Sequence, residues 1–74
     1  MAIPKTEKKN LMELVYAGIY DQGIQKAETL LKQYGNDSEI FGVLSGIYIE
    51  LGNADLAAQY AKQALKLDPL YVFA

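Results

Sequence analysis

The stretch FGVLSGIYIELGNADLAAQYAKQALKLDP, residues 41–69, decides the fold. Its apolar residues recur every three or four positions, which is the spacing of amphipathic helices and not of strands. Gly52 and Asn53 divide the stretch, because glycine adopts the left-handed conformation that ends helices and an asparagine side chain accepts hydrogen bonds from the amides that open the next one. Asp68-Pro69 ends the second helix, since proline disfavours helical geometry in the residue before it. The stretch therefore predicts a helical hairpin.

The same unit occurs twice in the chain, at one fixed offset that we call the repeat offset. Six identities align at this offset without a gap: Gly18 with Gly52, Asp21 with Asp55, Gln25 with Gln59, Ala27 with Ala61, Leu31 with Leu65 and Lys32 with Lys66. A fixed period of this length is typical of helical repeat proteins. Together with Gly35 as a further helix end and Asp37 or Ser38 as a further cap, it predicts four antiparallel helices. They are expected near residues 6–17, 21–34, 38–51 and 54–67.

The second copy resembles the tetratricopeptide repeat (TPR) family, whose members fold as helix-turn-helix units of about 34 residues. The resemblance rests on these residues: Phe41-x2-Leu44-Ser45-x2-Tyr48, then Gly52, Ala57-x3-Ala61, Ala64 and Pro69. The family pattern has glycine at position 45 and a large aromatic at position 61, so Ser45 and Ala61 depart from it, although Tyr60 stands next to the second. The resemblance implies an all-α fold, a fragment of an α-solenoid.

The resemblance implies one TPR-like domain over residues 1–74, with repeat one at about 4–37, repeat two at about 38–71 and the start of a third at 72–74. The first copy has Glu7 and Asn10 where the family pattern has an aromatic residue and a leucine. A terminal repeat is expected to be atypical, because one of its faces meets water. The first copy is therefore expected to be an N-terminal cap.

The last residues form an apolar segment: Leu70, Tyr71, Val72 and Phe73. Two repeats bury little surface, and a core this small rarely supplies more than about 3 to 5 kcal/mol of stability. The chain is then a piece of a longer array, an engineered fragment, or a unit completed by a second copy. We expect a homo-oligomer, most simply a twofold dimer, in which this segment contributes to assembly.

Composition argues against an enzyme. The chain has no Cys, and hence no disulfide and no thiolate metal site, and no His, the commonest transition-metal ligand and general base, so no cofactor or metal is expected. Ser38 and Ser45 are interpreted as structural. Seven Lys against nine Asp and Glu give a net charge of −2, which disfavours nucleic acid and favours a protein or peptide partner. The uncharged run 40–49 is too short to span a membrane, and without a secretory signal the expected location is cytoplasmic.

In TPR proteins the first helix of each repeat lines a concave groove, and the resemblance implies which residues face it: Met12, Val15, Tyr16, Gly42, Val43, Gly46 and Ile49. Two glycines inside a helix cost about 1 kcal/mol each relative to alanine. They serve either the close approach of a partner or tight packing within the chain. The lysines and asparagines with which some relatives grip an acidic peptide are missing, so an apolar or amphipathic partner is expected. The alternatives are a self-assembling scaffold and the docking domain of a larger enzyme.

Overall fold

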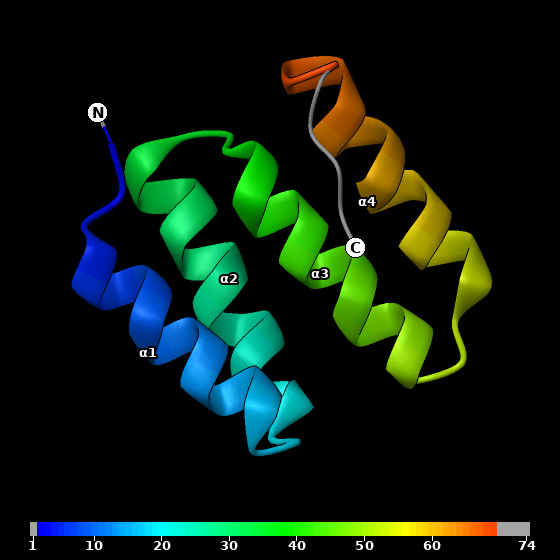
Figure 1. The fold of residues 1–74 in the computed structure, drawn as a ribbon, viewed down its shortest axis with the longest axis horizontal. Coiled ribbons are helices and arrows are strands. Elements are labelled where there is room, and N and C mark those ends of the chain that lie inside the picture. The colour runs from blue at the N-terminus through cyan, green and yellow to red at the C-terminus, as the bar shows by residue number, and fades with distance from the viewer. Residues whose placement is uncertain (1, 70–74) are drawn as a thin grey trace. The chain divides into compact units, whose positions relative to one another are not determined.

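The computed structural model describes residues 2–69, which form four helices and no strand. The helices are α1 (Lys5–Tyr16), α2 (Tyr20–Tyr34), α3 (Ser38–Glu50) and α4 (Ala54–Leu67), as Figure 1 shows. Each helix begins and ends within one residue of its predicted range. The prediction of an all-α fold with four helices is confirmed. The predicted start of a further helix lies outside the described residues.

The chain divides into two compact units, Met1–Gly35 and Asn36–Ala74. In the first unit α1 packs against α2, and in the second α3 packs against α4. Each unit is thus a pair of helices joined by a short turn, which is the building block of a helical repeat. That the units form one TPR-like domain, with the repeat boundaries given above, stays a prediction.

The two units turn from their first helix to their second in the same way. Gly18 and Gly52, which the repeat offset relates, have φ angles of 76° and 78°, the left-handed region that glycine enters without strain. The amide of the residue after each glycine donates back to a carbonyl five positions earlier. These bonds join Ile19 to Leu14 at 2.9 Å and Asn53 to Tyr48 at 2.8 Å. The repeat seen in the sequence is therefore also a repeat of backbone hydrogen bonds.

Side chains cap both helices of the second unit. Asp37 accepts a hydrogen bond from the Ile40 amide at 3.1 Å, and Asn53 accepts one from the Leu56 amide at 3.1 Å. At the other end of α4, Asp68 is extended (φ −140°, ψ 94°), as expected for a residue before proline. These three predicted boundary residues are confirmed. In the first unit, neither α1 nor α2 has a side-chain hydrogen bond at its N-cap.

The buried apolar residues are unevenly shared between the units. The first unit contributes Ile3, Leu11, Ala27 and Leu30, whereas the second contributes Ile40, Phe41, Leu44, Ile47, Ala57 and Ala64. The larger side chains of the second set come from α3, which is buried over much of its circumference. Of the four helices α3 is therefore the one most enclosed by protein.

Candidate functional site

The predicted groove residues of the first unit lie along the second half of α1. Met12 and Val15 are half-buried, and Tyr16, in the last turn, is 82% exposed. An apolar side chain of this size gains little from the fold when most of its surface stays in water. Tyr16 is therefore available for a contact with another molecule.

The predicted groove residues of the second unit lie along α3. Gly42 is buried, Val43 and Gly46 are half-buried, and Ile49 is 60% exposed. The exposed end of this set is therefore Ile49, in the last turn of its helix, as Tyr16 is in α1. The burial of Gly42 favours tight packing as the reason for that glycine. Whether the two sets of residues line one groove stays a prediction.

The predicted oligomerisation residues lie outside the described residues: Leu70, Tyr71, Val72 and Phe73. The expectation that they carry assembly therefore stays a prediction.

Ser45 connects the two helices of the second unit. It is the one buried polar residue among residues 2–69, and its hydroxyl donates to the backbone carbonyl of Ala57 at 2.8 Å. A buried hydroxyl needs such a partner, because leaving it unpaired costs about 1 to 3 kcal/mol. The side chain is thus used to hold α3 against α4, which agrees with the structural reading of this serine.

An aromatic stack lies beside this bond. The ring of Tyr60, on α4, stacks on Phe41 (centroids 6.0 Å apart, planes at 26°) and on Tyr48 (5.7 Å, 2°). Both partners belong to α3 and stand two turns apart on it. Position 61, where the TPR pattern has an aromatic, holds only Ala61, and the stack shows that Tyr60 supplies an aromatic ring to the pair of helices instead.

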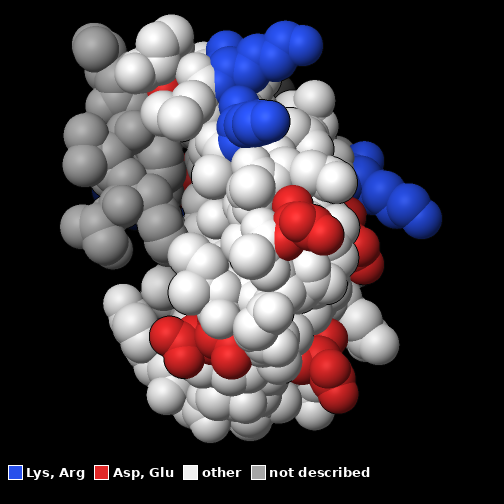
Figure 2. Space-filling view, turned by 90° about the vertical axis from the view of Figure 1, so that its right-hand side faces the viewer, with Lys and Arg blue, Asp and Glu red and all other residues white. Residues whose placement is uncertain are grey.

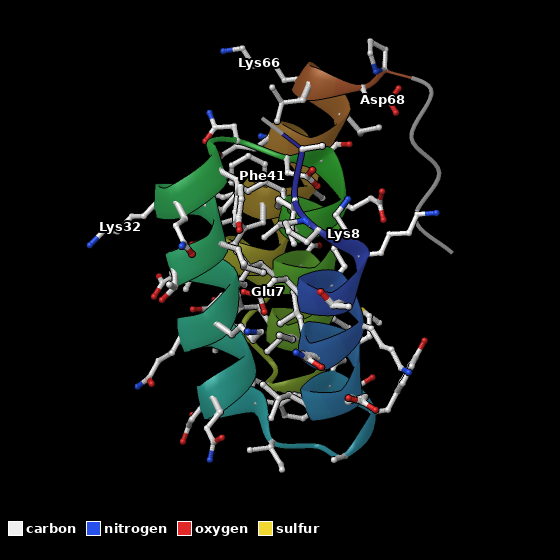
Figure 3. The ribbon with its side chains drawn as sticks, turned by 90° about the vertical axis from the view of Figure 1, so that its left-hand side faces the viewer. Glu7, Lys8, Lys32, Phe41, Lys66 and Asp68 are labelled. Atoms are coloured by element: carbon white, nitrogen blue, oxygen red, sulfur yellow. The ribbon has the colours of Figure 1, made fainter. Side chains whose placement is uncertain are left out.

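An ion pair occupies the matching place in the first unit. The repeat offset relates Phe41 to Glu7 and Tyr60 to Lys26, and the Lys26 Nζ lies 3.0 Å from the Glu7 Oε1. Glu7 is seen between α1 and α2 in Figure 3. Both side chains keep about a third of their surface, 28% for Lys26 and 32% for Glu7. The sequence analysis did not predict that an ion pair stands in the first unit where the second has two aromatic rings, although the repeat offset relates these two pairs of residues directly.

A shallow hollow lies over this part of the first unit. It is open to solvent and is lined by Leu14, Gln22, Gln25, Lys26 and Thr29. Thr29 is already bonded to the Gln25 carbonyl at 2.9 Å, and Lys26 to Glu7. The hollow is therefore open to solvent, and the ammonium group that lines it, that of Lys26, is already bonded to Glu7.

The first helices of the two units differ on one face. Ile40, Leu44 and Ile47 are at most 1% exposed on α3. Their equivalents on α1 at the repeat offset are exposed and polar: Thr6, Asn10 and Glu13. This face of the first helix is thus apolar and buried on α3, whereas on α1 it is polar and exposed to water.

The second helices differ in the opposite sense. Along α2 the residues Tyr20, Ile24, Ala27 and Leu31 are half-buried or buried. Their equivalents on α4 are Ala54, Ala58, Ala61 and Leu65, of which Ala61 is half-buried and the other three are exposed, Leu65 by 49%. An apolar stripe that is covered in the first unit is thus open in the second. Sequence reasoning did not single out this stripe.

Two features are absent from the described part of the chain. Within residues 2–69 no cluster of three His, Cys, Asp or Glu side chains is placed to hold a metal ion. None of the four described helices has the length and apolar character needed to cross a membrane. Comparisons with protein-family models, with curated proteins and with solved structures found no match to this chain.

Proposed function

We propose that this chain is a TPR-like protein-interaction module that binds an apolar or amphipathic helix, or an extended peptide, through the first helix of each unit. One observation carries the proposal: Tyr16 and Ile49, 82% and 60% exposed, both lie in the last turn of the first helix of their unit. Single exposed apolar residues are common on proteins. At the repeat offset Ile49 corresponds to Val15, the neighbour of Tyr16, so exposed apolar side chains gather at the same end of two related helices, which favours a shared use.

The repeat itself supports the TPR-like part of the proposal. The two helix pairs share their turn hydrogen bonds and their left-handed glycines, Gly18 and Gly52, at the repeat offset. Proteins built from such repeats commonly bind other proteins, although a fold alone does not fix a function. The net charge of −2 and the lack of Cys and His favour binding by apolar contact and not catalysis.

The chemistry of the two helices indicates the partner. On α1, Met12 and Val15 continue from Tyr16 toward the middle of the helix, and methionine adapts its shape to different apolar surfaces. On α3, Val43 and Gly46 precede Ile49. A partner would therefore meet apolar side chains at Val43 and Ile49 and backbone without a side chain at Gly46. These surfaces suit the apolar face of a helix, whose large side chains repeat every three or four residues.

The experiment measures binding of a fluorescein-labelled amphipathic peptide, designed with leucines on one face and lysines on the other, by fluorescence anisotropy. Ile49→Glu and Tyr16→Glu should each weaken binding at least tenfold, about 1.4 kcal/mol or more, because a charge replaces apolar contact area. Gln33→Glu, on the exposed side of α2, adds the same charge elsewhere and should bind as the unchanged chain does. Circular dichroism must show equal helicity for all three variants.

If the unchanged chain binds no such peptide at high micromolar concentration, the proposal is wrong. It is equally wrong if Ile49→Glu and Gln33→Glu bind alike. Self-assembly is a second candidate function, favoured by the open apolar stripe on α4.

A further inference from the structure

The open stripe on α4 differs from ordinary scattered apolar surface in its spacing. On α4, Ala54, Ala58, Ala61 and Leu65 follow one another at intervals of four, three and four residues. This alternation is the a/d pattern by which one helix packs along another. Leu65 is 49% exposed, Ala54 and Ala58 are exposed, and Ala61 is half-buried. The three alanines leave room for a second helix to approach closely.

The equivalent first helix α1 presents a polar face, whereas the stripe on α4 is apolar. On α1 the exposed positions Thr6, Asn10 and Glu13 are polar where α3 has buried apolar residues. Apolar patches that remain open on a protein commonly mark interaction sites. If copies joined head to tail, α1 of one copy would cover α4 of the next. This would bury the polar face of α1 against the apolar stripe, which is unfavourable. A twofold arrangement, in which the stripe meets itself, avoids it.

The charges along α4 fit that arrangement. Asp55 lies in the first turn, whereas Lys62 and Lys66 lie in the last two turns. Figure 2, which looks onto the side of the molecule that carries α4, shows the lysines in its upper half and most of the acidic groups below them. Two such helices placed antiparallel bring the acidic start of each beside the basic end of the other, and their helix dipoles also oppose.

We propose that α4 pairs with α4 of a second copy of this chain as an antiparallel, twofold helix pair. If Ala58 of one copy lies opposite the partner's Ala61, the same register places Ala54 opposite the partner's Leu65. It also places Asp55 beside the partner's Lys62, and this contact occurs twice by symmetry. This stripe shares no residue with the surface proposed for peptide binding.

The first test is the mass of the full chain by sedimentation equilibrium from about 1 to 500 micromolar, which covers dissociation constants in the micromolar range. A dimer is expected, and Ala58→Glu should weaken it at least a hundredfold, because a carboxylate would be buried against apolar surface. The matched control is Gln63→Glu, which adds the same charge at an exposed position of α4 outside the stripe. It should leave the dimer unchanged. A monomer throughout, or equal effects of the two variants, overturns the proposal.

The second test exchanges charges. Asp55→Lys sets like charges against Lys62 across the twofold axis, and Lys62→Asp sets them against Asp55, so each variant should dimerise about tenfold more weakly. Mixing the two variants should restore dimers of mixed composition, since every cross-pair is again opposite in charge. The chain with both exchanges should dimerise like the original. In a parallel pair each position would face its own copy, as it does in the original chain, so neither single exchange would weaken that dimer. Single variants that dimerise as tightly as the original, or failure of both the mixture and the double variant to recover, overturn the proposed geometry.

Discussion

Tyr60 and Lys26 hold equivalent positions in the two units, and replacing each with alanine compares the two ways in which a pair of helices is joined. Tyr60 stacks on two rings, at 6.0 and 5.7 Å between centroids. Lys26 makes one ion pair of 3.0 Å with Glu7, and the two side chains of this pair remain 28% and 32% exposed. The two substitutions should therefore differ strongly in cost.

The magnitudes follow from these contacts. Each aromatic pair contributes about 0.5 to 1.5 kcal/mol beyond the area it buries. Fully burying a large side chain stabilises by about 1.5 to 3 kcal/mol, and the half-buried Tyr60 gains about half of that. We therefore expect Tyr60→Ala to lower the free energy of unfolding by about 2 to 4 kcal/mol. A partly exposed ion pair contributes about 0.2 to 1 kcal/mol, which limits the cost of Lys26→Ala.

The assay is urea unfolding followed by far-ultraviolet circular dichroism, at one fixed protein concentration. Since a core of this size supplies only about 3 to 5 kcal/mol, Tyr60→Ala should unfold at least part of the chain in water, whereas Lys26→Ala should keep a full transition. Tyr60→Leu retains apolar area without a ring, so its cost should fall between the two. If Tyr60→Ala and Lys26→Ala shift the midpoint equally, the stack does not stabilise the second unit as argued.

Two further predictions concern the backbone and the small residues. Gly52→Ala should lower the free energy of unfolding by about 1 to 2 kcal/mol through backbone strain alone, because φ at position 52 is 78° and no atom lies within 4 Å of an added Cβ. Gly52→Asn should cost less, because asparagine tolerates this conformation better, and equal costs in urea unfolding would contradict this account. Ser45→Leu should cost about 1 to 3 kcal/mol through overpacking, yet Ala57→Gly in the same chain should recover part of that loss, since the first unit has Leu11 and Gly23, both buried, at these places. A double-mutant cycle with no coupling would refute the second prediction.

The helices were predictable because their boundaries depend on local chemistry. Gly18 and Gly52 end helices through their own backbone freedom, and Asp37 and Asn53 begin helices through their own side chains. Such residues act on neighbours within five positions of the chain. The repeat offset then relates each boundary of one unit to a boundary of the next.

The surfaces were less predictable, because burial depends on residues far away in the sequence. The sequence shows that Gly42 and Gly46 are small, but not that Gly42 is buried and Gly46 half-exposed. It likewise shows Glu7 as a departure from the family pattern, but not that Lys26 pairs with it, nineteen positions away. Tyr60 was found as a substitute for a missing aromatic only because it adjoins the position where one was expected.

The two units consequently differ in what their surfaces can support. The second unit joins its helices with the Tyr60 stack and the Ser45 bond, whereas the first relies on a partly exposed ion pair and a smaller set of buried side chains. Elements with few buried contacts open more readily than the rest of a protein, and surfaces that must hold a fixed geometry are best carried by rigid elements. An antiparallel pairing of α4 needs a fixed register over three turns, and α4 belongs to the better-joined unit. Tyr16, which we propose as a binding residue, lies in the less tightly joined unit, whose surface should adjust to a partner more readily than that of the second unit.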